Sequence, residues 1–211
     1  MHRIIMFVAA MLLLAGCSTV MEKQSSTQVE VNKGVPVVYI HPSDAAAYQQ
    51  ATVGVLPFLL PGGVDPAVGM GIGELYKDIL LGKQIFPRVQ LIGHSYGDYE
   101  DAIAAGREYG TDLVLAGRLN YFLQGTELGG AKLDISVRLI NVRTGATVWH
   151  IGQTMDQPMD YPRTDLFGFL ISSTLIEPIK RPAGAPVLTN MFAQSAVDVA
   201  DVLSGSSYVK R

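Results

Sequence analysis

The chain has only one cysteine, Cys17, among its 211 residues. It therefore cannot form an intrachain disulfide, and it lacks the disulfide framework that stabilises many small secreted domains. The four histidines are His2, His41, His94 and His150, and no group of His, Cys, Asp and Glu has the spacing of a metal site. We therefore expect no metal ligand and no other cofactor.

Charge is also scarce. Charged residues make up 17% of the sequence, and the formal net charge is −3. A nucleic-acid-binding domain needs a clustered basic face, so we expect no nucleic acid partner. Hydrophobic residues make up 48% of the chain. That proportion suits a well-packed domain, or a domain that buries further surface by assembling.

The N-terminal apolar run, residues 4–14, is shorter than the roughly 20 residues that span a bilayer. It follows the basic start Met1-His2-Arg3 and ends in small residues just before Cys17. A basic head, a short apolar stretch and a small-residue cleavage site are typical of a secretory signal peptide. We therefore assign residues 1–16 to a signal peptide.

Residues Leu14-Ala15-Gly16-Cys17 resemble the lipobox of bacterial lipoproteins. The resemblance implies cleavage after Gly16 and lipidation of Cys17, whereas the alternative is a cysteine that merely follows a signal peptide. Each CH2 group of an acyl chain that is buried in the membrane adds about 0.8 kcal/mol to the binding free energy, so several acyl chains anchor a protein more firmly than one chain does. In such lipoproteins an Asp after the cysteine favours the inner membrane, so Ser18 implies sorting to the outer membrane.

Cleavage would remove 16 of the 211 residues and leave 195, enough for one domain with an extension. Loss of Arg3 would change the formal net charge from −3 to −4. Residues 17–34 read as a flexible lipid tether spanning ~20–25 Å r.m.s.. Residues 35–176 are the predicted α/β domain, and residues 177–211 hold a proline linker and a C-terminal helix.

The fold class is predicted as α/β, of the α+β type, with a mixed sheet. Strand 35–40 is expected at an edge, because Pro36 lacks an N–H. Strand 52–58 is apolar on both faces, as a central strand is. Helix 66–81, capped by Asp65, then strand 89–92 and helix 98–109, capped by Asp98, complete two β-α units.

A three-stranded antiparallel meander is predicted over residues 112–155. Residues 132–139 alternate strictly, with Lys132, Asp134, Ser136 and Arg138 on a wet face. Strand 112–123 is expected to place five residues on its apolar face: Leu113, Leu115, Leu119, Tyr121 and Leu123. Helices at 165–175 and 187–203 should follow, joined by a linker with three prolines at 177–186.

Residues Gly93-His94-Ser95-Tyr96-Gly97 match G-x-S-x-G, the nucleophile elbow of serine hydrolases. A hydrolase also needs a base, an orienting acid and an oxyanion hole at the same place. Of the histidines, only His150 follows Ser95, and it lies within a predicted strand. We therefore predict a turn at Gly93 and Gly97, no catalytic residue and no enzyme. An esterase using Ser95 stays as an alternative.

Three further patterns have structural interpretations. Gly69, Gly71 and Gly73 do not form a phosphate loop, and we expect them to allow close helix packing, within the chain or between subunits. Asp98, Glu100 and Asp101 read as a capped, solvated helix start, and Trp149 as core. The apolar stretch 56–60 ends a core strand or marks a contact surface.

The segments VGVLPF (53–58), AIAAGREYGTDLVLAGRLNYF (102–122) and VRLINVRTGATVW (137–149) carry a family resemblance. Over about residues 50–155 the chain resembles outer-membrane lipoproteins of the CsgG and TolB amino-terminal-domain type. The PelC-like proteins, the Neisseria surface-antigen type and the activators of penicillin-binding proteins share this architecture. The polar connection 123–131 departs from CsgG, because no long apolar hairpin is visible.

The resemblance implies a non-catalytic α/β domain on the periplasmic face of the outer membrane. Such proteins oligomerise or dock on a protein partner in an export or envelope-assembly system, and the partner here is unknown. A second possibility is a regulator that activates a peptidoglycan synthase. These functions are expectations from the resemblance, and the residues themselves do not choose between them.

Overall fold

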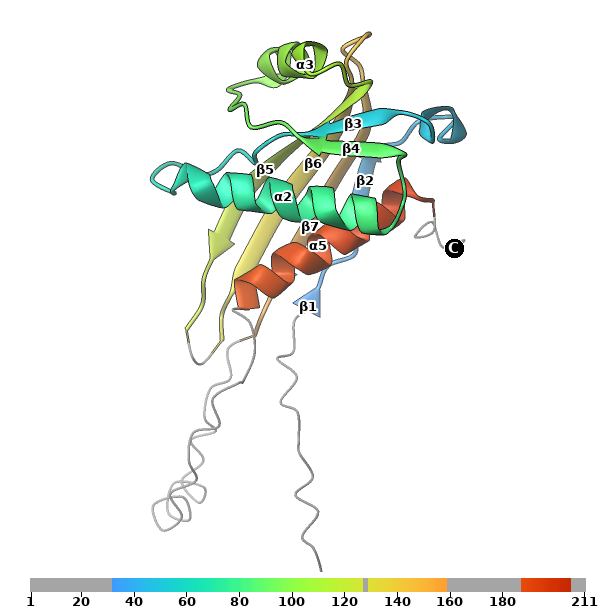
Figure 1. Ribbon diagram of the computed structural model, residues 1–211. Coiled ribbons are helices and arrows are strands. Elements are labelled where there is room, and N and C mark those ends of the chain that lie inside the picture. The colour runs from blue at the N-terminus through green and yellow to red at the C-terminus, as the bar shows by residue number, and fades with distance from the viewer. Residues whose placement is uncertain (1–31, 127–128, 159–186, 206–211) are drawn as a thin grey trace, which may run out of the picture.

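The computed structural model describes residues 32–126, 129–158 and 187–205 (Figure 1). The elements are β1 (Asn32–Lys33), β2 (Val37–Ile40), the 3-10 turn η1 (Ala46–Tyr48), β3 (Thr52–Val55), α2 (Pro66–Gly82), β4 (Arg88–Leu91), α3 (Tyr99–Glu108), β5 (Leu113–Leu123), β6 (Lys132–Asn141), β7 (Thr147–Asp156) and α5 (Val187–Leu203). The strands form one mixed seven-stranded sheet in the order β1-β7-β6-β5-β3-β4, with β2 also paired to β7. The α/β fold class with a mixed sheet is therefore confirmed.

The two predicted β-α units are β3-α2 and β4-α3. β3 pairs in parallel with both β4 and β5, so it is a central strand as its apolar pattern predicted. Its ladder ends at Val55, earlier than the expected residue 58. The Asp65 carboxylate accepts a hydrogen bond from the Ala67 N–H at 2.9 Å, and that of Asp98 accepts one from the Asp101 N–H at 2.9 Å. Both predicted caps therefore form.

β5, β6 and β7 form the predicted antiparallel meander. One detail of the prediction is wrong. The register of β5 against β6 shifts between Leu119 and Tyr121, so Phe122 rather than Tyr121 turns toward the core side. Because side chains alternate with a period of two, one extra residue moves everything after it to the other face. Tyr121 and Leu123, expected on the apolar face, are consequently exposed.

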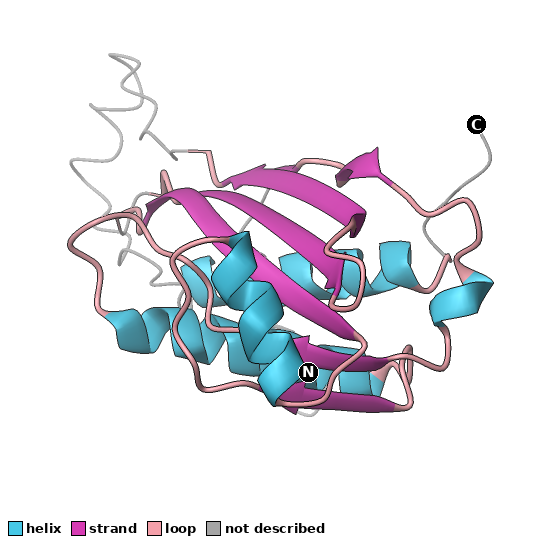
Figure 2. Cartoon of the chain, turned by 90° about the horizontal axis from the view of Figure 1, so that it is seen from above, coloured by secondary structure: helices cyan, strands magenta, loops and turns pink. Residues whose placement is uncertain are grey.

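Helices cover the two faces of the sheet unequally. α2 and α5 lie side by side across one face (Figure 1) and enclose the larger core, in which Trp149 is almost fully buried as predicted. α3 packs on the opposite face near one end, against a smaller cluster that includes Leu56, Val114 and Ile140. Figure 2 shows the strands fanning as the sheet twists. The rest of the second face, beyond α3, carries the polar residues of the meander.

Two of the three glycines that were expected to allow close packing do so, within the chain, whereas at Gly71 the prediction is wrong because nothing lies within 4 Å of an added Cβ. The Gly69 carbonyl accepts a hydrogen bond from the Phe58 N–H at 2.9 Å. A Cβ at Gly69 would clash with the Phe58 carbonyl oxygen, and one at Gly73 would lie 2.9 Å from the Leu56 carbonyl oxygen. Phe58 is buried beneath α2 and Leu56 is buried in the cluster on the α3 face, so this stretch ends the core strand.

β2 lies at an edge, as expected from Pro36, and pairs only with β7 among the described strands. Within the segment assigned to the tether, Asn32 and Lys33 form β1. The predicted helix at 165–175 and the linker at 177–186 lie outside the described residues. Among the helices in the described ranges, none is long and apolar enough to cross a membrane.

Candidate functional site

Cys17 and Ser18, the predicted lipidation and sorting residues, lie outside the described residues. The functional features that the structure does describe are the loop at Ser95, the junction where the chain enters the domain at β1, and an exposed surface along β2.

Ser95 is exposed in the loop that follows β4. With Tyr96, residues 57–64 and Pro66, it lines a cavity of about 290 Å³, and none of the lining residues is His, Asp or Glu. Beneath Ser95 the hydroxyl of buried Tyr96 donates a hydrogen bond to the Gly117 carbonyl at 2.8 Å. Burial raises the pKa of this phenol, so it remains a donor. The loop is thus held by its tyrosine, one residue after the serine.

The described histidines do not line the Ser95 cavity. His94 is exposed beside the serine. His150 lies on β7, where its ring centre is 4.8 Å from that of Tyr39, and the His41 ring is 6.2 Å from that of Trp149. The structure therefore does not bring Ser95 and a base together within the described part of the chain.

The acidic residues after the loop have the predicted structural role. The Asp101 carboxylate accepts a hydrogen bond from the Gly97 N–H at 3.1 Å, while Asp98 caps the first turn of α3. Asp98, Glu100 and Asp101 are all exposed. Across the described residues, no group of three His, Cys, Asp or Glu side chains could hold a metal ion.

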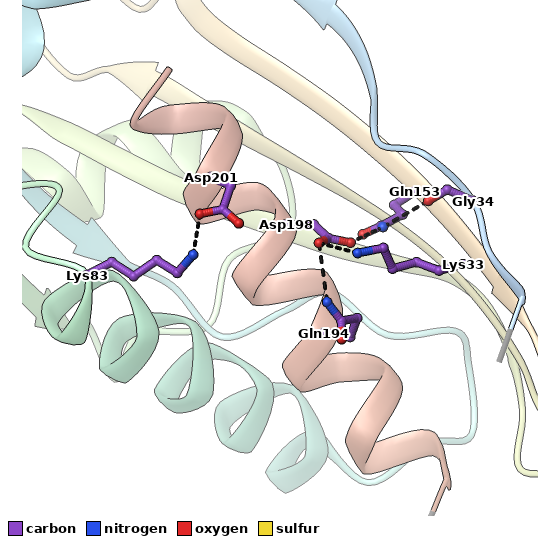
Figure 3. A network of polar contacts seen from close by, with 7 residues as sticks. All are labelled: Lys33, Gly34, Lys83, Gln153, Gln194, Asp198 and Asp201. Atoms are coloured by element: carbon purple, nitrogen blue, oxygen red, sulfur yellow. Dashed lines mark hydrogen bonds and ion pairs between the residues drawn. The ribbon is translucent and has the colours of Figure 1, made fainter. Parts of the chain in front are cut away.

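A buried polar network ties the start of the domain to α5 (Figure 3). Asp198 of α5 is only 7% exposed, and its carboxylate lies 2.7 Å from the Lys33 ammonium of β1. Gln153 of β7 donates from Nε2 to Asp198 at 2.5 Å and to the Gly34 carbonyl at 3.0 Å. Gln194 adds a contact of 3.3 Å to the same carboxylate. Three segments of the chain, β1, β7 and α5, therefore converge on one carboxylate.

This junction was not predicted. Asp198 occupies a position on the apolar side of α5, between Ser195 and Val199, which are also buried. An aspartate within an apolar helical stripe is the one signal that the sequence carried, because buried carboxylates require partners. Its partners Lys33 and Gln153 lie 165 and 45 residues away in the sequence, and no local sequence pattern predicts contacts over such separations.

Large apolar side chains are exposed along the edge of the sheet. We define the β2 surface as Val35, Val37, Tyr39 and Ile40. Val35 is 75% exposed, Val37 51%, Tyr39 63% and Ile40 40%. These are four of the ten large hydrophobic residues that are exposed in the described part of the chain. Apolar surface gathered at an unpaired sheet edge is typical of a site that pairs with another chain.

No protein-family model matches the sequence, and no curated protein matches it. Solved structures do match. The PelC dodecamer from Paraburkholderia phytofirmans is 20% identical, covers 71% of this chain and 96% of its own, and has a TM-score of 0.46. For lipoprotein GNA1162 from Neisseria meningitidis the identity is 16%, the coverage 60% and 94%, and the TM-score 0.39.

The C-terminal domain of LpoB from Escherichia coli is 17% identical, covers 50% of this chain and 83% of its own, and has a TM-score of 0.33. These neighbours are bacterial proteins, one of them described as a lipoprotein and another as a dodecamer. Because each TM-score is below 0.5, the likenesses assign neither a superfamily nor a function to this chain.

Proposed function

We propose that this protein is a lipid-anchored, non-catalytic component of an export or assembly system at the periplasmic face of the outer membrane. It acts by assembling with further copies of itself and by docking on a protein partner. The observation that carries the proposal is the exposed, apolar β2 surface on a chain whose residues 14–17 resemble a lipobox.

The anchor is supported by the residues at the N-terminus. The basic start, the apolar run and Leu14-Ala15-Gly16-Cys17 together resemble a lipoprotein signal, and Ser18 favours the outer membrane. The chain then enters the domain at β1, where Lys33 is paired with Asp198. Because buried Asp198 of α5 holds Lys33, the anchor would attach to the domain at a defined end of the sheet.

Assembly is supported by the β2 surface. β2 uses one of its edges to pair with β7, and no described strand pairs with its other edge. A free edge with apolar side chains is an aggregation hazard unless another chain covers it. A second copy or a partner that covers Val37 and Tyr39 would remove this apolar area from water, at about 25 cal/mol per Å².

Cysteine labelling tests the proposal directly. Lipidation would consume the Cys17 thiol, so a cysteine introduced elsewhere would be the only free thiol of the mature chain. We expect Val37→Cys to be protected from a maleimide in intact membranes and to react after the assembly is dissociated. Val68→Cys on α2 is the matched control, because Val68 is 40% exposed and lies away from β2. Equal labelling of both sites in membranes would contradict the proposal.

The absence of catalysis is tested at Ser95. We expect the purified protein not to hydrolyse a generic ester, because the cavity beside Ser95 has no lining base. Turnover that is present in the wild type and lost in Ser95→Ala would instead establish the esterase alternative.

A further inference from the structure

A groove of about 490 Å³ lies on the open face of the sheet, between α3 and β2. Its floor is formed by the wet sides of β5, β6 and β7, where Ser136 lies opposite Gly152. Tyr99 lines one side and Tyr39 the other. The volume is in the range of small-molecule sites, ~300–1,000 Å³.

Two arginines face this groove. Arg118 of β5 pairs in register with Ser136 of β6, and Arg138 of β6 pairs with Ala116 of β5. The two side chains are therefore diagonal neighbours on the same face, about 7–8 Å apart at their backbones. This spacing allows both guanidinium groups to reach one bound oxyanion.

Neither arginine is neutralised by the described residues. No ion pair in the described ranges involves Arg118 or Arg138. The one acidic side chain that lines the groove, Asp134, accepts a hydrogen bond from the Asn120 amide at 3.0 Å. The groove therefore carries a net positive charge, since two guanidinium groups face one carboxylate.

Arg138 is positioned with one donor unused. Its guanidinium carbon lies over the Tyr99 ring, 4.6 Å from the ring centre, in a cation–π contact. Its Nε is buried and has no hydrogen-bond partner in the described structure. A buried donor without a partner is unfavourable, and an anion in the groove would supply the missing acceptor.

The opposite wall is aromatic and accessible. The Tyr39 ring packs beside the His150 ring, and a Cβ at Gly152 would lie 2.9 Å from it, so the glycine leaves the room that Tyr39 occupies. Tyr39 nonetheless stays largely exposed toward the groove and the solvent. It offers a flat apolar surface next to the charged floor.

We propose that this groove binds an anionic ligand, in which a carboxylate or phosphate group contacts Arg118 and Arg138 and an attached ring packs on Tyr39. Guanidinium groups bind both oxyanions with paired N–H donors. The groove shares Val35, Val37 and Tyr39 with the β2 surface, whereas Arg118 and Arg138 lie outside that surface. The arginine variants therefore test anion binding separately from the proposed assembly.

The experiment is an NMR titration of the full chain in a non-ionic detergent, observing the arginine Nε–H resonances. The probes are inorganic phosphate, phenyl phosphate, acetate and phenylacetate, with phenylethanol as the uncharged comparison. We expect the Arg138 resonance to shift with the anions and to saturate at lower concentration for the two that carry a ring. Comparing inorganic phosphate with acetate, and phenyl phosphate with phenylacetate, then shows whether the groove prefers a phosphate or a carboxylate group.

Variants locate the binding. Arg118→Gln and Arg138→Gln should each weaken binding about tenfold or more. Arg138→Lys keeps the charge but removes the Nε donor, and should also bind more weakly. Arg88→Gln, at the start of β4 on the other edge of the sheet, is the matched control and should bind as the wild type does.

Two outcomes would overturn the proposal. One is the absence of any anion-dependent shift in the folded wild type, and the other is undiminished binding in Arg118→Gln. Arg118 is exposed, so its variant should fold even if Arg138→Gln does not. Binding of phenylethanol as strong as that of phenylacetate would show an apolar site instead of an anion site.

Discussion

The ammonium of Lys33 on β1 lies 2.7 Å from the carboxylate of Asp198 on α5, although 165 residues separate the two. The contact joins the first described strand to the last described helix across β7. A buried carboxylate is stable only when charged or polar groups surround it. Here Lys33, Gln153 and Gln194 do so, and the N-terminal and C-terminal parts of the domain become one unit.

Asp198→Ala should therefore lower the free energy of unfolding by about 2–3 kcal/mol, because it removes the carboxylate that accepts hydrogen bonds from Lys33 and from one of the two donors of the Gln153 amide. Urea unfolding of the full chain measures the change. Lys77→Ala is the control: among the described residues Lys77 pairs only with exposed Glu74 and Asp78, and its loss should cost about 0.5 kcal/mol or less. Equal effects of the two variants would show that the network contributes no more than a surface pair.

Two glycines of α2 should respond to alanine in opposite directions. At Gly69 a Cβ meets the Phe58 carbonyl oxygen, so Gly69→Ala should destabilise the fold by about 1–3 kcal/mol. At Gly71 nothing lies within 4 Å of the added Cβ, so Gly71→Ala should stabilise the helix by about 0.5–1 kcal/mol. Thermal unfolding compares them, and destabilisation by both variants would mean that Gly71 also packs closely.

The stability should also depend on the protonation of His150. Burial first, and the charge of Arg138 second, lower the pKa of its imidazole in the folded protein. Below the unfolded value of about 6.5, the unfolded chain binds a proton that the folded chain resists, so stability falls as the pH decreases until the folded pKa is passed. Urea unfolding between about pH 7.5 and about pH 5 measures this loss.

Two variants test whether His150 causes this loss of stability and whether Arg138 lowers the pKa of His150. His150→Gln should show a smaller loss of stability over that range than the wild type. Arg138→Gln should raise the pKa of His150 in an NMR titration, since it removes one of the two effects that lower it. An unchanged pH dependence in His150→Gln would assign the loss to other groups.

Local patterns were sufficient to predict most of the fold. Asp65 and Asp98 indicated helix starts, and the apolar strand at 52–58 indicated the centre of the sheet. Both features depend on residues that are close in the sequence, so a local pattern is enough to predict them. The bulge between Leu119 and Tyr121 was missed, since the sequence continued to alternate through it. A shifted register is decided by the partner strand.

Far less of the functional surface could be predicted. The roles proposed for Cys17 and Ser18 rest on contiguous residues and stay predictions, whereas Asp198, Gln153 and Lys33 meet only in the folded chain. The strict alternation at 132–139 placed Arg138 on a wet face, but Tyr99 and Arg118 reach it from α3 and β5. The exposure of Val37 and Tyr39 was also unexpected, because an apolar strand is ordinarily read as core.

The anchor gives a separate prediction. Cys17→Ala should abolish metabolic labelling with palmitate and release the protein from the membrane fraction, because no other cysteine can carry the lipid. Ser18→Asp should keep the label and move the protein toward the inner-membrane fraction. Retained labelling in Cys17→Ala would contradict the lipobox interpretation.

Assembly is the central claim, and the mass of the protein extracted from membranes in mild detergent tests it most directly. Native mass spectrometry should find one discrete mass that is a multiple of the mass of a single chain. Val37→Glu, which places a charge on the β2 surface, should reduce this mass to that of a single chain. Val68→Glu on α2 should leave the multiple intact. A wild-type protein that is a single chain at every concentration would contradict the claim and favour the regulatory alternative.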